Sequence, residues 1–313
     1  MTKIMILGAG IYQVPLIETA KKMGLYTIVV SIPGNYPGFA LADKVYYENT
    51  VDEDKILAIA KKERIKGIVT AGTDVCMKTV GRVCDAMGLN GLSYEASKVA
   101  VDKMLMKSRY EEYGVRTARF RQVSFDDTDI KKTVQELEFP LIFKSVDSSG
   151  SRGIIRVDSF EEFDSAIQYV RENTRKDYFL VEEFIEGEEF GAQAFAYDGN
   201  VSFILPHGDY VYQGDTGVPI GHYAPYNLSE EVIEDAKMQL RRAVKAMGLD
   251  NCAINADFIL KNGKTYVLEI GGRCGATCLA ELVSIYYGFD YYEKILRTAL
   301  DLSLIHISEP TRH

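Results

Sequence analysis

The chain has 313 residues, of which 47% are hydrophobic and 26% charged, a balance typical of a globular protein with more than one subdomain. Its net charge is −9, and it holds no long run of lysine or arginine, which argues against a nucleic-acid partner. We see no signal-peptide pattern and no apolar run near the roughly 18 residues of a membrane span, so we expect no membrane partner and a cytoplasmic location.

The five cysteines form no CxxC pair, as expected of reduced thiols in a cytoplasmic protein. Cys274 and Cys278 stand close enough in sequence to act together as metal ligands. No second pair or nearby histidine completes such a site, so the sequence does not favour one.

Residues 1–93 alternate short apolar runs with amphipathic segments, which predicts strand–helix–strand units and a parallel α/β domain. The expected strands lie at 3–10, 26–30, 44–47 and 67–70, and the expected helices at 12–23, 52–63 and 75–87.

A glycine turn after the first expected strand nearly matches the dinucleotide-binding pattern GxGxxG. Gly8 and Gly10 occupy the first two glycine positions, but Gln13 stands at the third. Ser31 also stands near the place where an acidic residue should meet a ribose. We therefore expect a turn that only connects strand and helix, with a nicotinamide-dependent oxidoreductase as the weaker alternative.

The stretch from Tyr94 to Glu112 reads as one long helix that carries Lys103. Beyond it lies a hairpin of two short strands, in which Lys144 follows the first strand and the connecting loop 147–153 is rich in serine and glycine. Such a loop can wrap its backbone amides around phosphate oxygens. The plain alternative is a solvated hairpin tip with a surface lysine.

An acidic segment, 182–189, and a last hairpin complete the pattern. The hairpin turns about Asn262 and Gly263 and carries Asp257 on one strand and Glu269 on the other. The expected elements are strands at 141–143, 154–157, 179–184, 253–260 and 265–270, and a helix at 230–247.

The turn of this last hairpin decides whether its two carboxylates face each other. With a two-residue turn at Asn262 and Gly263, Glu269 would pair with Ala256, and Asp257 would point to the opposite face. With a three-residue loop, Asp257 would lie directly across from Glu269. We therefore predict a type I turn with a glycine bulge and a left-handed Gly263; a tight two-residue turn would count against a shared metal site.

These pieces, in this order and spacing, resemble the ATP-grasp superfamily, and in particular carboxylate–amine ligases and the carbamoyl phosphate synthase large chain. The resemblance covers nearly all of 3–302. It implies an α/β fold with a parallel, Rossmann-like pre-ATP-grasp domain at 1–93. An ATP-grasp fold of two α+β subdomains would follow at 94–302, with its lid subdomain at about 115–185.

The resemblance also assigns roles to individual residues. Lys103 and Lys144 match the lysines that hold the α- and β-phosphates of ATP. The loop that closes over those phosphates is matched by Ser148, Ser149, Gly150, Ser151 and Gly153. The hinge that binds adenine through its backbone is matched by Glu182, Glu183 and Ile185, and the carboxylate that takes the ribose hydroxyls by Glu189.

Asp257 and Glu269 match the carboxylates that bind Mg2+, with Mn2+ as an alternative ion. Arg273 matches an arginine placed for the γ-phosphate and, with Lys144, is an expected catalytic residue. The family often has an asparagine two residues after the glutamate, where this chain has Gly271. Water, Asn255 or another group must then replace that ligand, or a second metal is held loosely.

The resemblance implies an ATP-dependent ligase. The γ-phosphate would pass to a small-molecule carboxylate, and an amine or related nucleophile would attack the acylphosphate, with ADP and phosphate as products. Amino acids are candidate substrates, and the resemblance allows a homodimer. The alternatives are a non-catalytic nucleotide-binding module, favoured by Gly271, and the oxidoreductase.

The acceptor side is less clearly marked. The stretch 207–226 is rich in glycine and tyrosine and lies where families of this kind often build an acceptor pocket. His207 or His222 could orient substrate, act as a base or serve only structure. Thr73 and Asp74 follow the fourth strand at the edge where α/β folds bind ligands, although Asp74 could equally cap the next helix.

Residues 303–313 continue no helical period and resemble the translation of a sequencing adapter. We leave them out of the expected fold. Chains of this layout usually have a further C-terminal segment, so we expect the natural chain to continue past Leu302.

Overall fold

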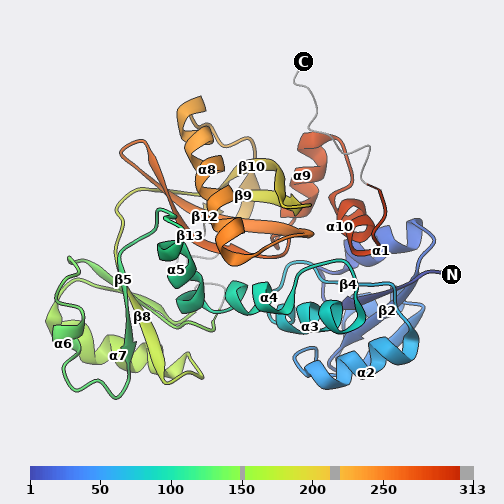
Figure 1. Cartoon of the computed structure of the whole chain (residues 1–313), viewed down its shortest axis with the longest axis horizontal. Coiled ribbons are helices and arrows are strands. Elements are labelled where there is room, and N and C mark those ends of the chain that lie inside the picture. Colours follow the sequence, from blue (N-terminus) through green and yellow to red (C-terminus); the bar gives the residue numbers. More distant parts are fainter. Residues whose placement is uncertain (149–151, 212–218, 304–313) are drawn as a thin grey trace.

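A computed structural model describes residues 1–148, 152–211 and 219–303 of the chain. It has three parts: an N-terminal parallel sheet with its helices, a small antiparallel sheet within 120–183, and a larger antiparallel sheet within 188–271 (Figure 1). This mixed architecture confirms the expected α/β fold class.

The first sheet has four parallel strands in the order β3-β2-β1-β4. The strands are β1 (Lys3–Leu7), β2 (Tyr26–Ser31), β3 (Lys44–Tyr47) and β4 (Gly67–Val69). The connecting helices are α1 (Val14–Lys22), the 3-10 turn η1 (Pro37–Leu41), α2 (Glu53–Glu63) and α3 (Met77–Met87). The central strands are apolar along their length because packed helices bury both of their faces.

The glycine turn after β1 is filled by the side chain that replaces its third glycine. Gln13 is buried, its Oε1 accepts the Gly10 N–H at 2.9 Å, and its Nε2 donates to the Ala71 carbonyl at 2.5 Å. The Gly10 amide is thus used inside the turn rather than offered to a pyrophosphate. This supports the connecting role of the turn over nicotinamide binding.

The single helix expected from Tyr94 to Glu112 is in fact two helices, α4 (Tyr94–Ala100) and α5 (Lys103–Glu112). Asp102 lies between them, and its carboxylate accepts the N–H groups of Met104 and Leu105 at 3.0 and 3.1 Å. An N-cap aspartate ends the preceding helix by starting a new one. The break places Lys103 in the first turn of α5.

The small sheet has the order β5-β8-β6-β7 and is antiparallel throughout. Its strands are β5 (Phe120–Ser124), β6 (Leu141–Lys144), β7 (Ile154–Val157) and β8 (Tyr178–Glu183). The helices with it are α6 (Ile130–Thr133), the 3-10 turn η2 (Phe160–Glu162) and α7 (Phe163–Glu172). Phe163 of α7 packs on Phe143 of β6, which packs on Phe179 of β8, within the core that holds α7 on this sheet.

The larger sheet has the order β11-β10-β9-β12-β13. Its strands are β9 (Glu188–Tyr197), β10 (Asn200–Val211), β11 (Pro219–Tyr223), β12 (Cys252–Lys261) and β13 (Lys264–Gly271). The long helix α8 (Glu230–Met247) packs on one face through its alanine and leucine stripe (Figure 1). The opposite face carries the polar side chains of the candidate site.

The predicted three-residue loop between β12 and β13 was wrong, but the left-handed Gly263 and the facing of Asp257 and Glu269 are confirmed. Lys261 pairs with Lys264 across a two-residue turn, in which Asn262 and Gly263 both have positive φ, of 51° and 72°. The pairing then shifts: Asp257 lies across from Glu269 and Phe258 across from Val267. Leu268 is thus an extra residue, and this β-bulge restores the facing that the tight turn alone would remove.

The C-terminal helices α9 (Leu279–Tyr287) and α10 (Tyr291–Ala299) return to the N-terminal part of the chain. Helix α10 packs against α1 and β4, beside which it lies in Figure 1. Its buried side chains share one core with Ile4 and Leu16 on one side and Phe195 on the other. Within the described ranges, every helix is too short or too polar to cross a membrane.

Candidate nucleotide and acceptor site

One row of paired residues crosses the polar face of the larger sheet. His207 pairs with Gly191, Gly191 with Asp257, and Asp257 with Glu269. Directly paired residues in antiparallel strands point to the same face, so these side chains lie along one line. Gly191 leaves open the space that the His207 ring fills.

The Glu269 carboxylate of this row affects the ionisation of Asp257. The Asp257 residue is exposed to solvent on one side, and protein atoms around the carboxyl group displace part of its water. This partial desolvation, with the nearby Glu269 carboxylate second, raises the pKa of Asp257 to about 7. Two carboxyl groups held this close favour the binding of a cation.

Lys103 supplies a positive charge to this pair. Its Nζ lies 3.1 Å from Glu269 Oε1 and donates to the Ser148 carbonyl at 2.6 Å. Its own N–H donates to the carbonyl of Val146 at 3.1 Å. Lys103 therefore connects the carboxylate row to the strand end that precedes the serine–glycine loop.

A second group of ion pairs joins Lys144 and Lys107 to one glutamate, Glu182. Lys144 Nζ is 2.9 Å from one oxygen of Glu182, and Lys107 Nζ is 3.2 Å from the other. Both Glu182 and Lys107 are almost fully buried. Burial opposes ionisation of Glu182, but the two lysines keep its pKa below the ordinary value. Lys107 was not predicted, although its position one turn after Lys103 on α5 gave a signal.

The serine–glycine loop is described only at its ends. Ser148 Oγ donates to the Asn173 carbonyl at 2.6 Å, and the carbonyl of Gly153 accepts the Ser145 N–H at 2.8 Å. Ser149, Gly150 and Ser151 lie outside the described residues.

The segment expected to meet adenine connects the two antiparallel sheets. The N–H groups of Glu183 and Phe184 donate to the carbonyls of Arg119 and Pro140, at 3.0 and 2.8 Å. Ile185 is buried, whereas the Glu189 side chain is exposed on β9, two residues before Gly191 and on the same face. Glu189 is also close enough to contribute to the raised pKa of Asp257.

Arg273 is held by a carboxylate from the N-terminal part of the chain. Its Nε and Nη2 donate to the two oxygens of Asp74 at 2.9 and 2.6 Å, a bidentate pair. Asp74 therefore binds Arg273, and no hydrogen bond from its side chain to the start of α3 is present in the described residues. Residues 71–74, the AGTD segment, thus support the site from the end of the parallel sheet.

Asn255 lies on the same face as Asp257, but its side chain is bonded to Gln193. Its Oδ1 accepts a hydrogen bond from Gln193 Nε2 at 2.5 Å, and Gln193 Oε1 accepts the Gly275 N–H at 2.9 Å. Asn255 pairs across the strands with Gly271, beside which Asp74 and Arg273 lie. The space that an asparagine would need at Gly271 is thus bounded by that ion pair.

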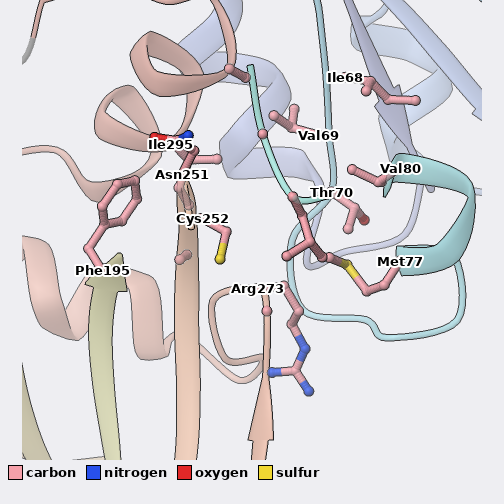
Figure 2. A pocket seen from close by; sticks show the side chains of 15 residues that line it. Ile68, Val69, Thr70, Met77, Val80, Phe195, Asn251, Cys252, Arg273 and Ile295 are labelled. Atoms are coloured by element: carbon pink, nitrogen blue, oxygen red, sulfur yellow. The ribbon is translucent and has the colours of Figure 1, made fainter. Parts of the chain in front are cut away.

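A small cavity lies between β4 and α3 on one side and β12 and α10 on the other (Figure 2). Its volume of about 40 Å3 would hold only a few water molecules. Its wall is mainly apolar, with Phe195 and Cys252 among the lining residues. The Arg273 guanidinium points away from these side chains (Figure 2). The cavity is therefore too small and too apolar for a charged substrate.

Comparison with known proteins gives one matching domain family, described as the ATP-grasp domain, over residues 137–281. Alanine–anticapsin ligase of Bacillus subtilis is 24% identical over 286 residues, which cover 82% of this chain and 60% of that protein. The chain thus spans about 60% of the length of this curated relative.

Solved structures extend the likeness to the whole fold. Phosphoribosylglycinamide synthetase from Anaerococcus prevotii is 38% identical with a TM-score of 0.83, over 96% of this chain and 76% of that one. N5-carboxyaminoimidazole synthetase from Staphylococcus aureus, solved with ADP, is 16% identical with a TM-score of 0.81, over 97% and 78% of the two chains. The second likeness concerns the fold alone.

Proposed function

The chain belongs to the ATP-grasp superfamily, and from this premise we propose that it is an ATP-dependent ligase that joins a carboxylate to an amine. The observation that carries the proposal is the contact of Lys103 with Glu269, at 3.1 Å. It brings a lysine suited to phosphate beside the carboxylate expected to bind metal. The hairpin β6–β7 meets Lys103 through the Ser148 carbonyl, and the AGTD segment holds Arg273 through Asp74.

In this proposal, Lys103 and Lys144 hold the α- and β-phosphates of ATP. Each lysine is paired with a glutamate, Glu269 or Glu182, so its ammonium is already oriented. Glu189 takes the ribose hydroxyls. Because the N–H groups of Glu183 and Phe184 are used within the lid, the Ile185 N–H and the carbonyls of this segment would meet adenine.

The residues at the carboxylate row fit a divalent cation. Asp257 and Glu269 are hard oxygen ligands on facing positions, and the Lys103 ammonium already stands as a cation against Glu269. These two carboxylates would hold Mg2+, with Mn2+ as an alternative. When bound, such an ion offsets the charge of the phosphates.

Arg273 is proposed to stabilise the charge that develops on the γ-phosphoryl group. Asp74 fixes its guanidinium through two bonds, so its direction is set before substrate arrives. The phosphoryl group would pass to the substrate carboxylate, and an amine would attack the resulting acylphosphate. Catalysis of this kind depends on positioning and charge rather than on a protein nucleophile.

Amino acids are the proposed substrates. The similarity to a ligase named for joining alanine to anticapsin supports this choice.

The test is phosphate release from ATP and Mg2+ in the presence of an equimolar mixture of the twenty common amino acids. We expect stimulated release by the parent and a loss of about 100-fold or more in Glu269→Gln and in Lys144→Met. Glu293→Gln and Lys237→Met, which change exposed surface pairs, are the matched controls and should keep the parent rate. ATP binding without stimulated release would instead identify a non-catalytic nucleotide-binding module.

A further inference from the structure

Three side chains outside the carboxylate row form a hydrogen-bonded chain. His222 Nδ1 lies 2.6 Å from Asp209 Oδ1, and His222 Nε2 lies 2.5 Å from Thr277 Oγ1. Asp209 and His222 are paired residues on β10 and β11. In this carboxylate–imidazole–hydroxyl order, the imidazole can take the proton of the hydroxyl while the carboxylate orients the imidazole.

The position of the protons follows from the neighbours. A carboxylate of Asp209 can only accept, so His222 carries its proton on Nδ1 and leaves Nε2 as the basic nitrogen facing Thr277. Although burial opposes it, hydrogen bonds from His207 and His222 hold the pKa of Asp209 well below its ordinary value. Asp209 is therefore charged and fixes the tautomer of His222.

His207 is oriented by the same carboxylate from the other side. Its Nδ1 lies 3.1 Å from Asp209 Oδ1, and its Nε2 lies 3.4 Å from Gln193 Nε2. The Gln193 amide cannot be reversed, because its oxygen already accepts the Gly275 N–H. His207 thus accepts at Nε2 and donates from Nδ1.

This arrangement argues against a metal at the three groups. Ligand atoms of His207, Asp209 and His222 do lie within 4.8 Å of one another, a spacing that a metal ion could bridge. A metal there would need unprotonated nitrogens. Both Nδ1 atoms instead carry protons directed at Asp209, so a hydrogen-bond network explains the cluster better.

Thr277 stands in a strained backbone conformation. Its φ is +52°, and Cys278 after it has φ +66°, both in the left-handed region that a β-branched residue such as threonine rarely enters. Such strain persists where the surrounding structure imposes it, often at functional sites. Here it aims the Thr277 hydroxyl at His222.

The loop that carries Thr277 also carries the proposed catalytic arginine. Arg273 begins it, and the Gly275 N–H fixes its middle to Gln193 on the polar face of the sheet. Ala276 packs against Gly72 of the AGTD segment, whose N–H donates to the Cys274 carbonyl. Thr277 therefore lies on the same short loop as the group proposed to meet the γ-phosphate.

We propose that Thr277, His222 and Asp209 form the relay that removes the proton from the acceptor amine; this inference rests on the proposed ligase function. Thr277 meets the amine, His222 receives the proton, and Asp209 is a positioning residue.

The step is balanced as follows. The nitrogen lone pair forms the C–N bond at the acylphosphate carbonyl, and the C–O bond to phosphate breaks with its electron pair on the leaving phosphate. The amine proton moves to Thr277 Oγ1 as the Thr277 proton moves to His222 Nε2. His222 then returns the proton to solvent or phosphate.

The test compares two nucleophiles on the same enzyme, with ATP, Mg2+ and the mixture of twenty amino acids. Hydroxylamine is unprotonated and strongly nucleophilic at neutral pH, so it traps the acylphosphate as a hydroxamate without help from a base. Amide formation between amino acids, measured by mass spectrometry, needs the relay. Hydroxamate from the parent tests the proposed ligase, and the ratio of the two products tests the relay.

We expect His222→Gln and Thr277→Val to lose about 100-fold in amide formation while hydroxamate formation stays within about threefold. Thr277→Ser keeps the hydroxyl and should form amide at close to the parent rate. Asp209→Asn should lose about tenfold in amide formation, with hydroxamate formation again retained. Tyr47→Phe, an exposed tyrosine on the edge strand β3 of the parallel sheet, is the control and should match the parent.

Equal losses of hydroxamate and amide in His222→Gln, or full amide formation in Thr277→Val, would overturn the relay. A metal bound stoichiometrically by the parent and lost from the Asp209→Asn variant would also overturn the relay. No hydroxamate and no phosphate release from the parent would instead count against the ligase function itself.

Discussion

Two lysines, Lys107 and Lys294, are equally buried, but in different surroundings. Each is only 2% exposed, and burial lowers the pKa of each to about 8. Lys107 faces the Glu182 carboxylate at 3.2 Å and donates to Thr117. Lys294 faces three phenyl rings at 4.9 to 5.6 Å and donates only a long bond, 3.3 Å, to Ser202.

The different surroundings give the two charges different roles: Lys107 acts within a charged cluster at the proposed site, whereas Lys294 is a charge buried in the apolar core. Lys107 belongs to a charged cluster that also orients Lys144 of the proposed ATP site, so its removal leaves Glu182 with a single partner. Lys294 has rings around its ammonium, which stabilise a cation weakly compared with the cost of desolvating it. The same burial should therefore have opposite consequences when each lysine is replaced.

The largest expected effect is that of Lys107→Met. It breaks a buried ion pair and leaves part of the Glu182 charge uncompensated, so the free energy of unfolding should fall by about 3 kcal/mol. Urea unfolding at pH 7 measures this. A loss below about 1 kcal/mol would mean that Lys144 alone satisfies Glu182, and the two lysines would then differ less than we infer.

Thr117→Val should follow, with a loss of about 2 kcal/mol in the same measurement. The Thr117 hydroxyl accepts from Lys107 and donates to the Val267 carbonyl at 2.7 Å, so valine leaves two buried groups without this partner. Thr117→Ser is the matched control and should stay within about 0.5 kcal/mol of the parent.

Lys294→Met should stabilise the protein at pH 7, by about 1–2 kcal/mol. The folded pKa of Lys294, about 8, lies below the ordinary 10.5, so the folded state carries the cost of the buried charge below pH 8. That cost is relieved as pH rises from 8 to 10.5, and the advantage of methionine should shrink over this window. An advantage that grows with pH, or a loss at pH 7, would contradict this.

The smallest expected effect is that of Ser202→Ala, the partner of Lys294. Because the bond is long and the lysine has three rings beside it, we expect a change within about 0.5 kcal/mol. A loss comparable to that of Thr117→Val would show that Lys294 depends on its hydrogen bond as Lys107 does.

Much of the fold follows from residue patterns that act locally. The helix at 230–247 and the strand at 154–157 were predicted with their observed bounds, because apolar periodicity and clear turn residues mark their ends. The break at Asp102 was missed, since the helical pattern runs through it and only the capping carboxylate stops the helix. An aspartate before a lysine within such a pattern is a usable signal.

The candidate site was less accessible to prediction, because its contacts join distant parts of the chain. The facing of Asp257 and Glu269 was expected, but from the wrong turn, and no residue type announces the bulge at Leu268. The capture of Arg273 by Asp74 needs the parallel sheet beside the antiparallel one. The ion pair of Lys107 joins helix α5 to Glu182 on β8, so the spacing from Lys103 predicts the helix face of Lys107 but not its partner.

The packing of α10 determines when the N-terminal sheet can bury its apolar face during folding. Side chains of 291–299 cover the face formed by α1 and β4. Gly67 lies so close to the Ala299 carbonyl oxygen that a Cβ at Gly67 would be 2.8 Å from it. During synthesis the first sheet therefore leaves the ribosome with this apolar side open, and it stays open until residues 291–299 have emerged. Such long-range closure slows folding and leaves the early chain dependent on protection from aggregation.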